Sequence, residues 1–179
     1  SALRIDGEDR VTAVTDTGFW YSTSIERQDD GKPRAFAVGR LSPILDDKGA
    51  PFLDKWSVDA EGLALGKDIA FVSAEQFNRV LRFDRRSDLF SAPSEIFVAQ
   101  FPGPKLEESF GLEAIALIPE GNPQSGALLA LSEGSLSEKG DLRGFILRPE
   151  QTDELAIVRS HGYSITDADY LPDGDLLIL

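Results

Sequence analysis

The most regular pattern in the chain is a short apolar run opened by a carboxylate, then a turn, then a second apolar run closed by a carboxylate. The first run lies within residues 59–65 and carries Glu61, and the second lies within 67–75 and ends at Glu75. A Gly-Lys dipeptide separates them and suits a tight turn. Because both runs are short and apolar on both faces, they predict two buried β-strands paired as a hairpin.

The same pattern returns at three other places in the chain. One copy carries Glu113 and Glu133, another begins around Asp167, and a weaker copy opens the chain at Ser1. The opening positions Ser1, Glu61, Glu113 and Asp167 are 60, 52 and 54 residues apart. A repeat of roughly 50 residues built from strands and turns is typical of the blades of a β-propeller.

Two more strand-like segments follow each complete hairpin, so each repeat has four predicted strands. The outer strand of each repeat is expected at 35–39, 95–99 and 154–158. Residues 42–56 contain two prolines and an Asp-Asp-Lys-Gly run without a sustained period, and are interpreted as a long loop between blades. No segment has the sustained period of an amphipathic helix.

The predicted fold class is therefore an all-β propeller of about three and a half four-stranded blades. The predicted blades span about 1–41, 59–102 and 111–160, and a fourth starts at 165–179. Propellers typically have about 4–8 blades, and an open array would expose apolar faces and strand edges. We therefore expect 1–179 to be part of a larger propeller domain.

Composition narrows the chemistry that this fold can support. The chain has 179 residues, of which 41% are hydrophobic, so a sizeable core is available. It has no cysteine, which excludes disulfides and thiolate metal sites. No apolar run approaches the roughly 20 residues needed to cross a bilayer, so membrane insertion is not expected.

The charge balance is strongly acidic. Eighteen Lys and Arg residues against 31 Asp and Glu residues give a formal net charge of −13. This charge argues against nucleic acid and anionic membranes as partners and favours cations or cationic ligands. Solubility alone would explain the charge equally well.

The carboxylates that open and close the hairpins are the candidate functional residues. In a hairpin, the start of the first strand and the end of the second lie at the same end. If these strands are the innermost ones, the following carboxylates ring one mouth of a central channel: Asp16, Glu61, Glu75, Glu113, Glu133 and Asp167. Facing carboxylates need a divalent cation, arginine partners or shared protons. Alternatively, they accept hydrogen bonds from backbone N–H groups across the blade junctions and reach no ligand.

Other candidate chemistry is weaker. Calcium or magnesium fits the carboxylates better than zinc, because His161 is the only histidine and thiolates are absent. Without a Gly-x-Ser-x-Gly motif, a Ser-His-Asp hydrolase is poorly supported. Arg79, Arg82, Arg85 and Arg86 could bind phosphate, but fit equally well beside a strand and on a solvated turn.

The ordered succession of these motifs resembles the phytase-like domain family, which is named for an esterase-like activity of phytase. The motifs that carry the resemblance are Asp59-Ala-Glu-Gly-Leu-Ala64, Val72-Ser-Ala-Glu75, Arg79-Val-Leu-Arg-Phe83, Gly111-Leu-Glu-Ala-Ile-Ala116, Leu131-Ser-Glu133, Thr166-Asp167 and Leu171-Pro-Asp-Gly174. The resemblance implies a ring of about six blades and export to the periplasm or the cell exterior. In related propeller phytases, acidic residues at the channel mouth hold Ca²⁺ ions that bind substrate phosphate. It therefore implies metal-ligand roles for Glu61, Glu75, Glu113, Glu133 and Asp167.

Two functions are consistent with these observations. The first is a Ca²⁺-dependent phosphoester or ester hydrolase that binds a small anionic or ester substrate at the channel mouth. The second is a non-catalytic propeller of the cell envelope that binds a small ligand or a protein partner and uses its acidic repeats structurally. The sequence assigns neither a catalytic residue nor an oligomeric state, because fold alone does not decide function.

Overall fold

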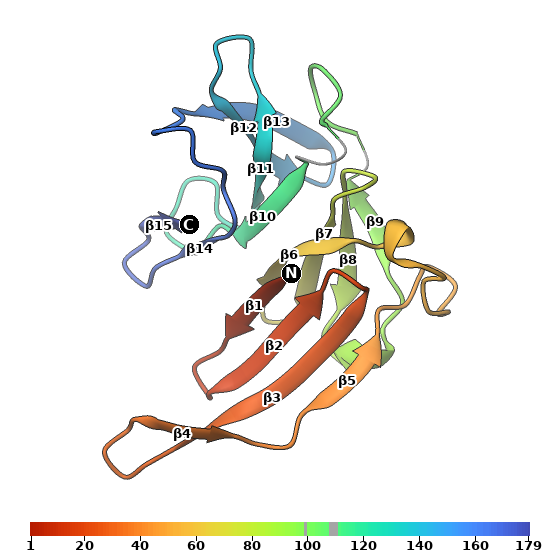
Figure 1. Cartoon of the computed structure of the whole chain (residues 1–179), viewed down its shortest axis with the longest axis vertical. Helices are drawn as coiled ribbons and strands as arrows, with labels where there is room; N and C mark the ends of the chain where they lie inside the picture. The colour runs from red at the N-terminus through yellow and green to blue at the C-terminus, as the bar shows by residue number, and fades with distance from the viewer. Residues whose placement is uncertain (99, 108–110) are drawn as a thin grey trace.

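The computed structural model describes residues 1–98, 100–107 and 111–179, and it consists almost entirely of antiparallel β-sheets (Figure 1). In this described part, the helices are two single-turn 3₁₀-helices, η1 (Lys55–Ser57) and η2 (Leu89–Ser91). None of its helices has the length and apolar character that a bilayer-spanning helix requires. The predicted all-β fold class is confirmed.

The first sheet contains five strands. These are β1 (Ala2–Ile5), β2 (Arg10–Thr15), β3 (Phe19–Arg27), β4 (Pro33–Phe36) and β5 (Arg40–Pro43). The nine-residue strand β3 is long enough for two partners in line, because residues 19–22 pair with β5 and residues 25–27 pair with β4.

This arrangement corrects two predictions for the first repeat. The predicted outer strand at 35–39 ends early, and β5 continues the outer edge. The predicted loop at 42–56 starts inside β5 and contains an antiparallel bridge between Leu45 and Pro51. Gly39 lies between the two strands, where a Cβ atom would come within 2.5 Å of the Tyr21 side chain. A side chain at this position would displace the outer end of the Tyr21 ring, and glycine avoids that contact.

The second and third sheets have the predicted order of four antiparallel strands. The second contains β6 (Ala60–Leu65), β7 (Ile69–Ala74), β8 (Arg79–Asp84) and β9 (Glu95–Val98), and the third contains β10 (Leu112–Leu117), β11 (Leu128–Leu136), β12 (Leu142–Arg148) and β13 (Gln151–Ile157). A final hairpin joins β14 (Ala168–Tyr170) to β15 (Leu176–Ile178). Ala99, the last residue of a predicted outer strand, lies outside the described residues.

The first strand of each sheet lies at the centre of the arrangement. Strand β6 packs against both β1 and β10, and β10 packs against β14, while the later strands of each sheet extend outward (Figure 1). Apolar side chains fill the space between neighbouring sheets. Trp20 of the first sheet meets Phe83 of the second edge-on at 5.1 Å between ring centroids. This is the blade arrangement of a propeller, in which each sheet buries its faces against its neighbours.

Candidate functional site

Two β-bulges aim glutamates out of the central strands. The register between β6 and β7 shifts between Ala60 and Leu63, and that between β10 and β11 shifts between Leu112 and Ala114. Glu61 and Glu113 lie at these shifts. A bulge adds a residue that the partner strand does not match, which redirects side chains and leaves backbone amides unpaired. One such amide is that of Gly62, whose N–H donates a hydrogen bond to the buried Ser73 hydroxyl at 2.7 Å.

The other two glutamates follow the second strand of each hairpin. The Glu75 N–H donates to the Asp59 carbonyl at 3.0 Å, and the Glu133 N–H donates to the Gly111 carbonyl at 2.9 Å. These hydrogen bonds extend the hairpins one step beyond their strands. As a result, each closing glutamate lies beside the opening of its own hairpin, at the same end of the sheets.

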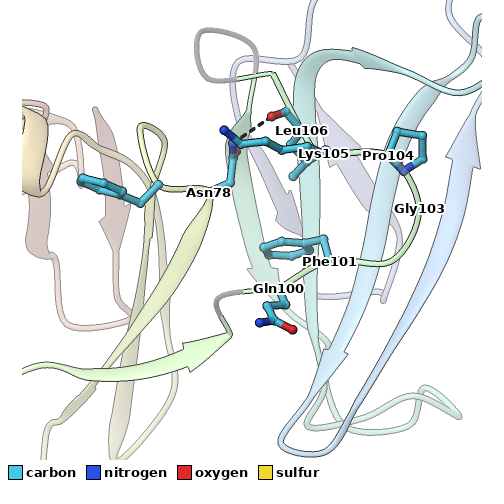
Figure 2. A pocket seen from close by; sticks show the side chains of 8 residues that line it. Asn78, Gln100, Phe101, Gly103, Pro104, Lys105 and Leu106 are labelled. Carbon is cyan, nitrogen blue, oxygen red and sulfur yellow. Dashed lines mark hydrogen bonds between the residues drawn. The ribbon is translucent and has the colours of Figure 1, made fainter.

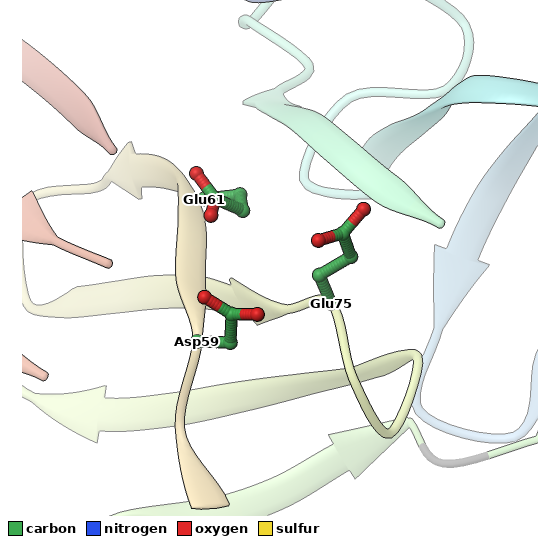
Figure 3. A group of neighbouring side chains, drawn as sticks. All are labelled: Asp59, Glu61 and Glu75. Atoms are coloured by element: carbon green, nitrogen blue, oxygen red, sulfur yellow. The ribbon is translucent and has the colours of Figure 1, made fainter. Parts of the chain in front are cut away.

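The structure brings these carboxylates together in two groups, as far as the described residues show. The first contains Asp59, Glu61 and Glu75, and the second contains Glu75, Glu113 and Glu133. In each group, one carboxylate oxygen from every residue lies within 4.8 Å of the others. Figure 3 shows the first group, with Glu75 on the side of the third sheet. Glu75 belongs to both groups and joins them into one acidic site.

Asp59 is the most buried carboxylate of this site, with 3% of its surface exposed. Its Oδ2 accepts a hydrogen bond from Gln76 Nε2 at 2.8 Å, and Lys55 Nζ lies 3.4 Å from its Oδ1. Oδ1 has no hydrogen-bond partner among the described residues. A buried carboxylate is costly unless it is paired and hydrogen-bonded, so this oxygen is only partly compensated by Lys55.

Burial and mutual repulsion make two of the glutamates hard to ionise. Burial, followed by the charges of Glu61 and Glu133, raises the pKa of Glu113 to about 7. Burial also raises the pKa of Glu75, opposed by the Gly111 N–H that points at its Oε1 from 3.4 Å. Without a cation, Glu113 is therefore partly protonated near neutral pH.

Asp167 does not join this site, contrary to its expected place in the acidic ring. Both of its carboxylate oxygens accept hydrogen bonds from the Arg4 guanidinium at 2.9 Å. Arg4 is 9% exposed, lies 3.3 Å from an Asp169 oxygen, and donates to the carbonyls of Ile115 and Ala168. Arg4 on the first sheet therefore ties the third and fourth sheets together, and Asp167 serves as its counter-ion.

Removing the Asp167 charge should affect folding and leave cation binding unchanged. Asp167→Asn weakens a bidentate ion pair of a buried arginine, so we expect the free energy of unfolding to fall by about 1–2 kcal/mol. Urea unfolding with and without calcium measures both effects, with the exposed Asp47→Asn as the matched control. A lost calcium response with unchanged stability would contradict this assignment.

Asp16 and His161 also lie outside the two groups. Asp16 accepts a hydrogen bond from Lys55 Nζ at 2.8 Å, and this bond lowers the pKa of Asp16. His161 lies in an exposed turn with φ of 53°, and its Nδ1 is 2.7 Å from Ser160 Oγ. The Lys55 ammonium group lies between Asp16 and Asp59, so Asp16 is linked to the acidic site only through this lysine.

Sequence reasoning missed the role of Asp59. When the repeats are aligned on Glu61 and Glu113, the position two residues earlier is Asp59 in one copy and Gly111 in the next. A feature present in one repeat only leaves no periodic signal. The signal that could have identified Asp59 is its place directly before an apolar strand, where a residue is expected to be buried.

The donor set determines which ions suit this site. The groups offer carboxylate oxygens without histidine or cysteine, which favours hard cations such as Ca²⁺ and Mg²⁺ over zinc. A hard cation would also compensate the charges that raise the pKa of Glu75 and Glu113. The residues present therefore fit a calcium ion.

Comparisons with known proteins agree with this fold. A family model described as "Phytase-like: Esterase-like activity of phytase" matches residues 1–179. Regucalcin from Agrobacterium tumefaciens, described as a calcium-binding protein, aligns over 99% of this chain with 13% sequence identity and a TM-score of 0.50. A protein from Bacteroides uniformis, provisionally named 6-phosphogluconolactonase, aligns over 98% with 12% identity and a TM-score of 0.45.

These matches differ in what they establish. The chain spans 66% of the length of the first protein and 62% of the second. Among curated proteins, no match was found. At this identity, the likeness to regucalcin shows the propeller fold alone.

Proposed function

This chain belongs to the phytase-like family, and we propose that it forms part of a calcium-dependent hydrolase of phosphoesters or esters that acts at the acidic site. The observation that carries the proposal is the position of Glu75, which shares its carboxylate between the two groups. A carboxylate placed in this way can hold two cation positions side by side, and carboxylates at this spacing repel one another without a cation.

The proposed ligands are Asp59, Glu61, Glu75, Glu113 and Glu133. The local backbone positions four of them: Glu61 and Glu113 lie at bulges, and Glu75 and Glu133 are placed by hydrogen bonds that close their hairpins. Gln76 fixes the orientation of the Asp59 carboxylate through its Oδ2. This leaves Oδ1 as the oxygen available to a cation, in competition with Lys55.

Bound calcium would supply positive charge that neutralises the substrate anion and polarises water for attack. The residues of the chain hold that charge at one end of the central strands. A small anionic phosphoester or an ester is the proposed substrate, because a bound cation would attract a phosphate group and polarise an ester carbonyl. Nucleic acid is not a proposed partner of a chain whose net charge is −13.

We also propose that the protein acts in the periplasm or outside the cell. Calcium sites of extracellular modules work at about 10⁻⁴–10⁻³ M, which suits carboxylate groups that already share Lys55. Fractionation of the native host tests this proposal, and recovery of the protein in the cytoplasm would contradict it.

Calcium is expected to raise the thermal midpoint, and by more at about pH 8 than at about pH 6. The pKa of Glu113 is raised to about 7 in the folded protein. Below that pH, the folded protein therefore keeps Glu113 protonated, whereas the unfolded chain ionises it. The metal-free protein therefore loses stability as pH rises from the unfolded-state pKa through about 7. Calcium must displace this proton and so binds more tightly at higher pH. Thermal shift at both pH values, with EDTA as the blank, measures this.

A panel of phosphoester and ester substrates, with and without EDTA, tests catalysis. Hydrolysis that stops on chelation supports the proposal. Calcium binding without turnover by the full-length protein would instead assign a non-catalytic binding propeller. A calcium response that is equal at both pH values would contradict the role given to Glu113.

A further inference from the structure

A lysine side chain already brings a positive charge to the first carboxylate group, which contains Asp59, Glu61 and Glu75 (Figure 3). Lys55 Nζ lies 3.4 Å from Asp59 Oδ1 and donates a hydrogen bond to Asp16 Oδ2 at 2.8 Å. The ammonium group therefore lies where a cation bound to Asp59 would also carry its charge.

The Asp59 oxygen that faces this ammonium group is incompletely satisfied. Asp59 is 3% exposed, and its Oδ1 accepts no hydrogen bond from the described residues, whereas its Oδ2 accepts one from Gln76. At 3.4 Å, the contact with Lys55 is an ion pair that is longer than a good hydrogen bond. Calcium contacts oxygen ligands at about 2.3–2.6 Å, so it would satisfy this buried oxygen better than the lysine does.

The carboxylate on the far side of the group is held by packed backbone. Glu75 begins the β7–β8 turn, and its carbonyl accepts a hydrogen bond from the Asn78 N–H at 2.8 Å. The Asn78 side-chain amide in turn donates to the Leu106 carbonyl at 3.4 Å, which ties the turn to the segment that leads into the third sheet (Figure 2). The Lys55 side chain, by contrast, is 51% exposed on a flexible four-carbon stem. An arriving cation would therefore move the lysine before it moved the carboxylates.

The backbone that carries Lys55 is anchored to the second sheet. Arg79 at the start of β8 donates a hydrogen bond to the Ser57 carbonyl, at the end of η1. Its guanidinium also lies over the rings of Phe52 and Phe77, 5.6 and 5.1 Å from their centroids. These contacts keep Lys55 beside the acidic site even when its side chain moves.

We propose that Lys55 is a tethered counter-cation that makes the first carboxylate group select divalent over monovalent cations, and that calcium displaces it from Asp59 while it stays bonded to Asp16. This inference rests on the proposed function and concerns the ion selectivity of the same site. A monovalent ion would replace one unit charge by another and lose part of its water shell, so it has no advantage over the lysine. Calcium brings a second charge and binds several carboxylate oxygens at once.

Removing the lysine charge should strengthen cation binding, which the loss of a merely structural contact would not do. We expect Lys55→Met to bind calcium at least about tenfold more tightly than the parent in calorimetric titration, because a positive charge within about 4 Å of the ion is removed. Lys55→Arg keeps the charge and should stay close to the parent affinity. Lys48→Met removes an exposed lysine from the loop before η1 and is the matched control, which should bind calcium as the parent does.

Selectivity is measured on the metal-free proteins in EDTA. Sodium chloride should raise the thermal midpoint of Lys55→Met above its value in choline chloride of equal concentration, because sodium can take the place of the lost ammonium group. The parent and Lys48→Met should not distinguish the two salts. The Ser1 amino group, which pairs with Glu61, is common to all of these proteins and does not affect the comparison.

The outcomes separate this inference from the proposed function. If the parent binds calcium and Lys55→Met binds it no more tightly, the lysine does not compete and the inference fails, while the calcium site stands. If Lys55→Met alone binds calcium, the lysine excludes divalent ions as well, which contradicts both the selectivity and the calcium-dependent function of the parent. If neither binds calcium, that function fails, and the sodium response of Lys55→Met decides whether the lysine excludes monovalent ions. An equal sodium response in the parent would overturn the selectivity.

Discussion

Replacing Glu75 by glutamine is expected to abolish the calcium response of this protein. Glu75 is the carboxylate common to both groups, so this single change removes a ligand from each. At calcium concentrations about 100-fold above Kd, bound calcium stabilises a fold by about 2.7 kcal/mol, which is roughly 5–10 °C in thermal midpoint for a chain of this size. We expect Glu75→Gln to lose this shift, together with any EDTA-sensitive hydrolysis.

Without calcium, Glu75→Gln should not reduce the stability of the fold. Burial and the neighbouring carboxylates raise the pKa of Glu75, so its charge destabilises the metal-free fold above that pKa. Glutamine removes the charge and keeps an oxygen that can accept from the Gly111 N–H. Glu75→Gln should therefore be at least as stable as the parent in EDTA. Glu150→Gln, at an exposed position, is the control. A less stable variant with an intact calcium response would make Glu75 a purely structural residue.

Replacing Gly62 by alanine should cause a large loss of stability, because the added methyl group would meet backbone atoms of the neighbouring sheet. A Cβ atom there would lie 2.6 Å from Ser73 Oγ, 2.9 Å from the Glu113 carbonyl oxygen and 3.0 Å from the Ile115 amide nitrogen. Two of these neighbours are backbone atoms of β10, so relief requires the second and third sheets to move apart. We expect the free energy of unfolding to fall by about 2–3 kcal/mol, measured by urea titration.

Gly62→Ala should also weaken calcium binding, because the atom it displaces belongs to Glu113. Gly7→Ala is the matched control, since a Cβ atom at Gly7 meets nothing within 4 Å and its φ is not in the left-handed region. Equal stability of the two variants would mean that β6 and β10 are not packed as closely as described. Reduced stability with unchanged calcium affinity would separate the packing role from the site.

The hairpins and their order could be predicted because their signals are local. The runs around Glu61 and Glu113 read as strands from their apolar pattern, and the closing positions Glu75 and Glu133 followed from the geometry of a hairpin. The β-bulges were not predictable, because a bulge shifts the register by one residue without changing the apolar pattern. Asp59 was missed for a related reason, since its position is glycine in the next repeat.

The sequence by itself determined an all-β chain of repeated blades and placed four glutamates at one end of their hairpins. Pairing partners within a hairpin are neighbours along the chain, so periodicity and turn residues suffice to define them. Only the tertiary structure decided that Asp167 belongs to Arg4 and that Glu75 belongs to two groups. Those contacts join residues on different sheets, 163 positions apart in the first case, and depend on how the sheets pack around the centre. An ion pair between residues so far apart in the sequence leaves no pattern in the chain, because only the packing of the sheets brings the two charges together.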